Sequence, residues 1–170
     1  MNPPTRGHEG LVRHMLNEAQ KLRADPYIVV TLTQDPKKNP LTPNQKVRYL
    51  NQMFPGVPKL VSSNPLPIIE KLGKNGYNEV TMVIGENRGR QFNWVKTPKS
   101  VASRPKGAVS ATMTRNAAAR NNFNAFKKLV SNKVNARGLM NNVRRGLGVG
   151  AKRSPMKSPP SKRRRTTSVV

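Results

Sequence analysis

The chain has 170 residues, enough for one domain of roughly 100–150 residues and an appendage. It contains no cysteine, which excludes disulfides and thiolate metal sites, and no apolar run near the ~20 residues that span a bilayer. All 7 acids and 11 Lys/Arg lie in residues 1–86, whereas residues 87–170 contain 21 Lys/Arg and no acid. A block of one-signed charge favours a polyanion such as nucleic acid as its partner; a solvated tail that only aids solubility is the alternative.

Strands and helices alternate in the first half of the chain. Apolar residues at three- and four-residue spacing indicate the first helix, and Thr42-Pro43 supplies an N-cap and a first-turn proline for the second. A nearly continuous apolar run is typical of a parallel strand covered on both faces. The predicted elements are helix 8–24, strand 27–33, loop 34–41, helix 42–54, strand 59–62, helix 65–72 and strand 79–85.

The second half is less regular and more basic. We expect a short helix over 86–95, helices over 113–120 and 122–130, and a weakly helical stretch over 132–145, whereas 96–107 lacks strong periodicity. Residues 151–170 are rich in Ser, Pro, Lys and Arg and cannot bury enough apolar surface to fold alone.

The alternation predicts an α/β fold: a Rossmann-like parallel sheet with flanking helices over residues 1–130. A basic helical extension over 131–150 and a basic, disordered or extended C-terminal tail over 151–170 follow it. Ligands of such sheets bind beyond the carboxyl ends of the strands, where helices begin.

Two motifs would lie at that edge. Pro3-Pro4-Thr5-Arg6-Gly7-His8 resembles the (His/Thr)-x-Gly-His motif of the nucleotidyltransferase superfamily, the cytidylyltransferase-like enzymes, and Ser110–Arg115 resembles its Ser-x-Thr-x-x-Arg signature. Between them, Val83–Arg88 is similar to the family's strand-end Gly-x-(Asp/Asn)-Arg segment. Asp35–Leu41 is similar to a loop of phage and large-virus members. The resemblance covers roughly residues 1–130.

The resemblance implies a reaction in which a small phosphorylated acceptor attacks the α-phosphate of a nucleoside triphosphate and pyrophosphate leaves, usually with Mg²⁺. It implies His8, Thr5 and Arg115 as catalytic residues. The implied nucleotide- and phosphate-binding residues are Gly7, Lys37, Lys38, Gly85, Asn87, Arg88, Ser110 and Thr112. No residue is implied as a metal ligand. Taken singly, these residues could be ordinary helix caps and surface cations.

One departure from the family leaves activity open. Family members have a central β-strand immediately before the first motif, whereas this sequence starts at Met1-Asn2-Pro3. We expect that strand to be encoded upstream, supplied by a partner, or lost in a repurposed domain. The chain is therefore expected to be either an active viral-type nucleotidyltransferase or a non-catalytic, transferase-derived protein that binds nucleic acid or a viral capsid assembly.

The basic tail favours the second possibility. Two clusters of Lys and Arg about ten residues apart resemble a bipartite nuclear signal. We therefore expect the protein in the host cytoplasm or nucleus, or packaged in a virion. The predicted nucleic-acid-binding residues are Arg144, Arg145, Lys152, Arg153, Lys162, Arg163, Arg164 and Arg165.

Overall fold

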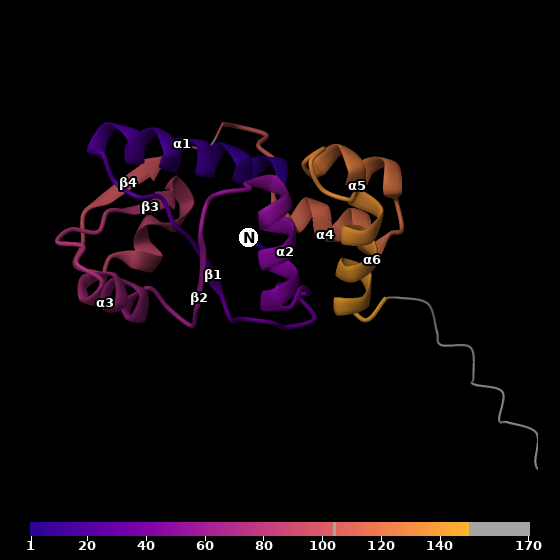
Figure 1. Cartoon of the computed structure of the whole chain (residues 1–170). Coiled ribbons are helices and arrows are strands. Elements are labelled where there is room, and N and C mark those ends of the chain that lie inside the picture. The colour runs from indigo at the N-terminus through magenta and orange to yellow at the C-terminus, as the bar shows by residue number, and fades with distance from the viewer. Residues whose placement is uncertain (104, 150–170) are drawn as a thin grey trace, which may run out of the picture.

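The computed structural model describes residues 1–103 and 105–149, and it has a mixed α/β fold. Strands and helices occupy the first part of the chain and three helices the last part (Figure 1). The elements are α1 (Arg6–Leu22), β1 (Ile28–Thr31), α2 (Pro43–Met53), β2 (Lys59–Ser62), α3 (Leu66–Lys74), β3 (Met82–Gly85), the 3₁₀ helix η1 (Glu86–Phe92), β4 (Lys99–Ala102), α4 (Ala111–Ala119), α5 (Phe123–Leu129) and α6 (Ala136–Gly146).

Polar N-caps explain where most of these helices begin. Thr42 accepts a hydrogen bond from the N–H of Gln45, and Pro43 occupies the first turn, as the sequence predicted for α2. Ser110, Asn122 and Asn135 accept in the same way at the starts of α4, α5 and α6. Each cap satisfies a backbone N–H that the helix itself leaves without a partner.

The strands form two parallel pairs, so a single Rossmann-like sheet is not confirmed. β1 pairs with β2, with Ile28 opposite Lys59, and β3 pairs with β4, with Met82 opposite Lys99. Among the described residues no strand joins the two pairs into one sheet. The expectation of parallel strands with crossover helices is confirmed only at the level of each pair.

Helix α1 packs on both strand pairs. Val12 is buried in a small core with Ile28 and Val30 of β1. His14, on the same helix, lies 2.8 Å from the Ser100 hydroxyl of β4, so this histidine is half-buried and contacts a strand. Figure 1 shows α1 lying along the strand side of the molecule.

Helices α4, α5 and α6 form a helical group with its own core. Phe126, Val130, Leu139 and Val143 are fully buried there. The sequence-based expectation placed the end of the α/β domain at residue 130. The core includes residues on both sides of this position, because α6 packs against both α4 and α5. Tyr49 and Met53 of α2 also enter this core, whereas Leu50 of the same helix enters the core around β1. Helix α2 therefore connects the strands to the helical group.

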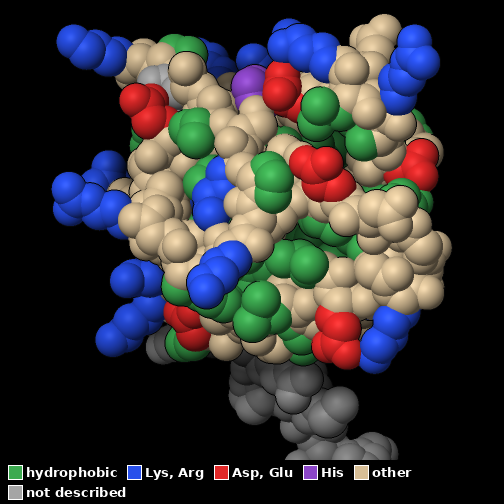
Figure 2. Space-filling model, turned by 90° about the vertical axis from the view of Figure 1, so that its left-hand side faces the viewer, with side chains coloured by type: hydrophobic (Ala, Val, Ile, Leu, Met, Phe, Trp, Pro, Cys, Tyr) green, Lys and Arg blue, Asp and Glu red, His purple; other side chains and the backbone are tan. Residues whose placement is uncertain are grey.

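The strand side of the molecule has a mixed surface. Figure 2 shows hydrophobic side chains there among basic and acidic ones. Some of the exposed apolar surface comes from three strands, through Val29, Val61 and Val101. Single exposed apolar side chains of this kind are common on protein surfaces. No helix of the described residues is long and apolar enough to cross a membrane.

Most predicted elements lie where the sequence placed them, within a few residues. The strand β4 is the element that the sequence missed, because Lys99–Ala102 is short and contains a single β-branched residue. The predicted tail residues 151–170 lie outside the described residues.

Candidate functional site

The first motif forms the start of α1. Thr5 is the N-cap, fully buried, and its backbone N–H donates to Nδ1 of His8 over 3.0 Å. The Thr5 hydroxyl lies 2.8 Å from the same ring nitrogen. Because Nδ1 accepts from a backbone N–H, a neutral His8 ring has its proton on Nε2. The arrangement therefore fixes the imidazole with Nε2 as a hydrogen-bond donor.

The second motif forms the start of α4. The Ser110 hydroxyl accepts from the N–H of Met113 over 3.2 Å and caps the helix. Thr112 is exposed, and its hydroxyl accepts from Nη2 of Arg115 over 3.0 Å. Ser110 is therefore used as a cap, and Thr112 orients the arginine one helical turn further on.

The two motifs lie against each other in space, although about 100 residues separate them in the sequence. A β-carbon on Gly7 would lie only 2.2 Å from the carbonyl oxygen of Val109, the residue before Ser110. Nη1 of Arg115 donates to the carbonyl of Asn2 over 2.8 Å. The segments that contain His8 and Arg115 therefore lie next to each other.

Asn2 fixes the N-terminal segment to the loop before α2. Its side-chain amide donates to the carbonyl of Leu41 over 3.2 Å and accepts from the N–H of Leu41 over 3.1 Å. Asn2 is only 6% exposed. Sequence reasoning missed this residue, because no local pattern indicates a partner 39 positions away.

Lys46 is a buried cation that the sequence analysis did not select. It is 2% exposed, and its ammonium donates to the carbonyls of Thr31 and Thr33, at and just beyond the end of β1. Burial lowers the pKa of this side chain. The sequence spacing does indicate this burial, since Lys46 precedes Leu50 by four positions and Met53 by seven and therefore lies on the same helix face.

Positive groups gather at the N-terminal segment. Burial lowers the pKa of the Met1 amine to about 6, and repulsion from Lys46, Arg88 and Arg115 acts in the same direction. Burial also lowers the pKa of Arg115, which attraction to Asp35 partly opposes. We call Lys46, Arg88, Arg115 and the Met1 amine the cation cluster. Cations from α2, η1 and α4 thus all repel the Met1 amine. Positive charges arranged in this way favour a bound anion.

The loop between β1 and α2 presents two further lysines. Asp35 accepts hydrogen bonds from the backbone N–H groups of Lys37 and Lys38, over 2.9 and 2.7 Å, and from the Asn39 side chain over 2.6 Å. These bonds, first that from Lys38, lower the pKa of Asp35 to about 2. Both lysine side chains are exposed on this fixed turn.

The strand-end segment lies at the carboxyl end of β3. Gly85 is its last residue, and Asn87 and Arg88 are exposed in η1. Nη1 of Arg88 donates to the side chain of Gln91 over 2.7 Å. Arg88 belongs to the cation cluster because its charge repels that of the Met1 amine.

The predicted nucleic-acid-binding residues occupy different environments. Arg144 donates to the carbonyls of Ala118, Ala119 and Val149, so its guanidinium binds backbone at the ends of α4 and α6. Arg145 is exposed in the last turn of α6. The other predicted residues lie outside the described residues: Lys152, Arg153, Lys162, Arg163, Arg164 and Arg165.

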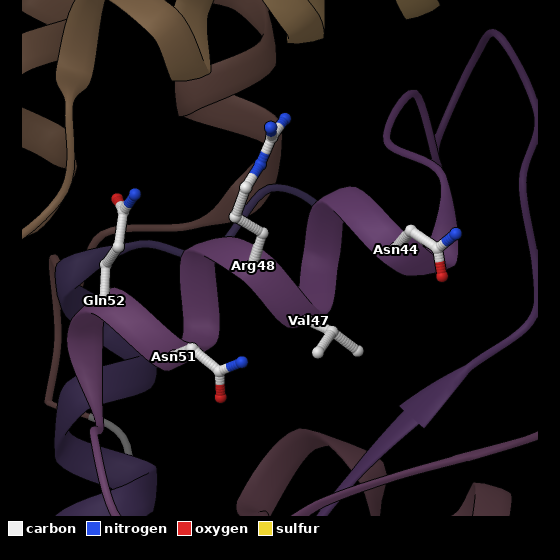
Figure 3. Close-up of a pocket in the computed structure, with 5 residues that line it drawn as sticks. All are labelled: Asn44, Val47, Arg48, Asn51 and Gln52. Carbon is white, nitrogen blue, oxygen red and sulfur yellow. The ribbon is translucent and has the colours of Figure 1, made fainter.

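The described part of the chain contains no group of three or more His, Asp or Glu side chains able to hold a metal ion. A hollow of about 490 Å³ lies on the outer face of α2, and Figure 3 shows the side chains that line it. Neither the residues that the sequence implicated nor those of the cation cluster line it.

Comparison with protein-family models, with curated proteins and with solved structures found no match.

Proposed function

We propose that the chain binds the phosphates of a nucleoside triphosphate at the cation cluster and acts as a nucleotidyltransferase-like protein of viral type. The observation that supports this proposal most directly is the meeting of the two motifs, through Gly7 on Val109 and Arg115 on Asn2. A phosphate oxygen of the acceptor would form a bond to the α-phosphorus. The bond from that phosphorus to the oxygen bridging the β-phosphate would break, and pyrophosphate would leave.

Each side chain would have a different role in binding or catalysis. Nε2 of His8 would donate to the α-phosphate as negative charge develops, and Thr5 would act as the positioning residue that holds the ring. Arg115 and Arg88 would bind phosphate oxygens, because a guanidinium matches them with paired donors. Lys46 would add a buried positive charge, and Lys37 and Lys38 would reach the outer phosphates from their turn.

Magnesium fits this site only as a companion of the nucleotide. Mg²⁺ is commonly held by substrate phosphates with water and few protein carboxylates, and the described residues provide no acidic cage. When bound, the ion would neutralise charge on the triphosphate. The contribution of the chain itself is the set of donors and cations described above.

The first test is equilibrium binding of ATP and CTP to the full chain, with Arg88→Ala as the variant. Loss of a hydrogen bond to a charged group costs about 1.5–3 kcal/mol, so affinity should fall roughly 10- to 100-fold. Arg90→Ala is the matched control, because Arg90 is exposed on the same 3₁₀ helix. Equal loss in both variants, or no binding by the wild type, would refute the phosphate site.

The second test is pyrophosphate release from ATP or CTP with a set of phosphorylated acceptors. His8→Ala should lower the rate by roughly 10²–10³-fold, the effect of removing one charge-stabilising donor. His14→Ala, on the same helix, should retain activity because His14 contacts Ser100 of β4. Unchanged turnover in His8→Ala would remove this residue from the mechanism.

A further inference from the structure

A second hollow, of about 300 Å³, opens where the start of α1 meets the helical group. Its walls come from the start of α1, from α5, from the turn that leads into α6 and from the first residues of α6. The side chains that define its chemistry are Arg6, Phe123, Lys127, Ser131, Asn132 and Arg137. We call it the helical hollow.

Positive charge dominates the helical hollow. Three cations, Arg6, Lys127 and Arg137, line it beside polar side chains, and no acid is among its lining residues in the described part of the chain. Phe123 and Lys127 are four positions apart on α5, so they lie on one face of that helix. Three cations without a counter-ion in one concave site favour an anion as ligand.

Two of these cations are held in place before any ligand binds. Nε of Arg6 donates to the carbonyl of Val130 over 2.9 Å. The guanidinium of Arg137 stacks on the ring of Phe123, 3.7 Å from its centre. A fixed guanidinium loses less side-chain entropy on binding and presents paired donors that match phosphate.

The surroundings of the hollow extend the same charge. Residues 105–149 contain nine Lys/Arg and no acid. The two ion pairs among the described residues, Lys21 with Glu18 and Lys74 with Glu70, both lie in the first half of the chain. The helical group therefore has a positive field over an area larger than one small anion would need.

We propose that the helical hollow binds a phosphate of a polynucleotide backbone, independently of the nucleotide site. A polynucleotide supplies the repeated negative charge that the whole helical group can neutralise. Because Arg137 covers one face of Phe123, the hollow offers a phosphate more than it offers a base to stack. The binding is therefore tolerant of sequence.

The test measures binding of a fluorescein-labelled, mixed-sequence single-stranded DNA of 20 nucleotides to the full chain over a salt titration. The site variant is Lys127→Gln with Arg137→Gln. The control, Lys128→Gln with Arg120→Gln, removes the same charge at two exposed positions of the helical group outside the hollow. Each phosphate contact on a single strand contributes about 0.7 to the slope of log affinity against log salt, so the site variant, which removes one such contact, should lose about 0.7.

The outcomes distinguish binding at the helical hollow from non-specific electrostatic attraction to the whole basic surface. The proposal requires that the control lose much less slope than the site variant; equal loss means diffuse attraction only and overturns it. The single variant Lys127→Gln keeps the Arg137–Phe123 contact and should lose only part of this slope, which excludes misfolding as the cause. Inorganic phosphate that binds through Lys127 and Arg137 while the DNA slope stays unchanged would assign the hollow to a small anion and also overturn the proposal.

Discussion

Gly7 lacks a side chain for a reason that lies within the fold itself. A β-carbon there would be 2.2 Å from the Val109 carbonyl oxygen, well inside contact distance. The glycine of the first motif thus allows the loop before α4 to reach the start of α1. This contact is what brings Arg115 back to the N-terminal segment.

Replacing Gly7 by alanine should therefore lower stability. Inserting atoms into a packed site typically costs about 1–3 kcal/mol, and the neighbour here is backbone that cannot rotate away. Gly10→Ala is the matched control, since a β-carbon at Gly10, on the same helix, would contact nothing. That change should stabilise the protein by about 0.5–1 kcal/mol, because glycine is a poor helix former. Urea unfolding of both variants measures the difference, and an unaltered Gly7→Ala midpoint would contradict the contact.

The sequence predicted the motif residues but not all of their partners. Thr5, His8, Ser110 and Arg115 were selected because their segments resemble family motifs; the structure places these segments at the starts of α1 and α4, and the functional roles stay predictions. The roles of Asn2 and Lys46 depend instead on Leu41 and on the end of β1, which lie far away in the sequence. Such contacts follow from tertiary packing, which a local pattern does not encode.

At the scale of elements, the turn over residues 35–39 is closed by one carboxylate. Three donors from Lys37, Lys38 and Asn39 converge on Asp35, which is why they lower its pKa to about 2. Because the folded pKa is below the unfolded value of about 3.9, the charged form contributes stability above that pH. The contribution is lost as the pH falls through about 2.

NMR titration of the Asp35 carboxyl carbon measures this directly. The midpoint should lie near 2 in the wild type. Asn39→Ala removes one donor and should raise the midpoint, while the bonds from Lys37 and Lys38 keep it below that of an unfolded aspartate. A wild-type midpoint near 4, the ordinary value for aspartate, would show that the turn is not closed by Asp35.

The elements themselves were easier to predict than their pairing. Apolar runs and caps identify β1, α2 and β3 from neighbouring residues alone. Whether four strands form one sheet or two pairs depends on hydrogen bonds between distant segments, and here β1 pairs only with β2 and β3 only with β4 among the described residues. The fold class was therefore predictable, and the sheet was not.

At the scale of the whole molecule, α2 joins two cores that would otherwise be separate. Tyr49 and Met53 pack with the helical group, and Leu50 packs with Val12 and Ile28. A close approach of α6 to the loop before α2 strengthens this connection: a β-carbon on Gly146 would lie 1.9 Å from the carbonyl oxygen of Pro40. The acid-free helices thus pack against α2, the helix that carries Lys46 of the cation cluster.

If α2 couples the two cores, the described part of the chain should unfold as one unit. The single tryptophan, Trp94, follows η1 and reports on the strand side, while far-UV circular dichroism reports on all helices. In urea both signals should share one midpoint. Leu50→Ala removes a side chain that is 1% exposed and should cost about 2–5 kcal/mol, moving both midpoints together. Met113→Ala, at an exposed position of α4, should leave both nearly unchanged. A tryptophan midpoint that moves while the helical midpoint stays would show that the helical group folds independently of α2.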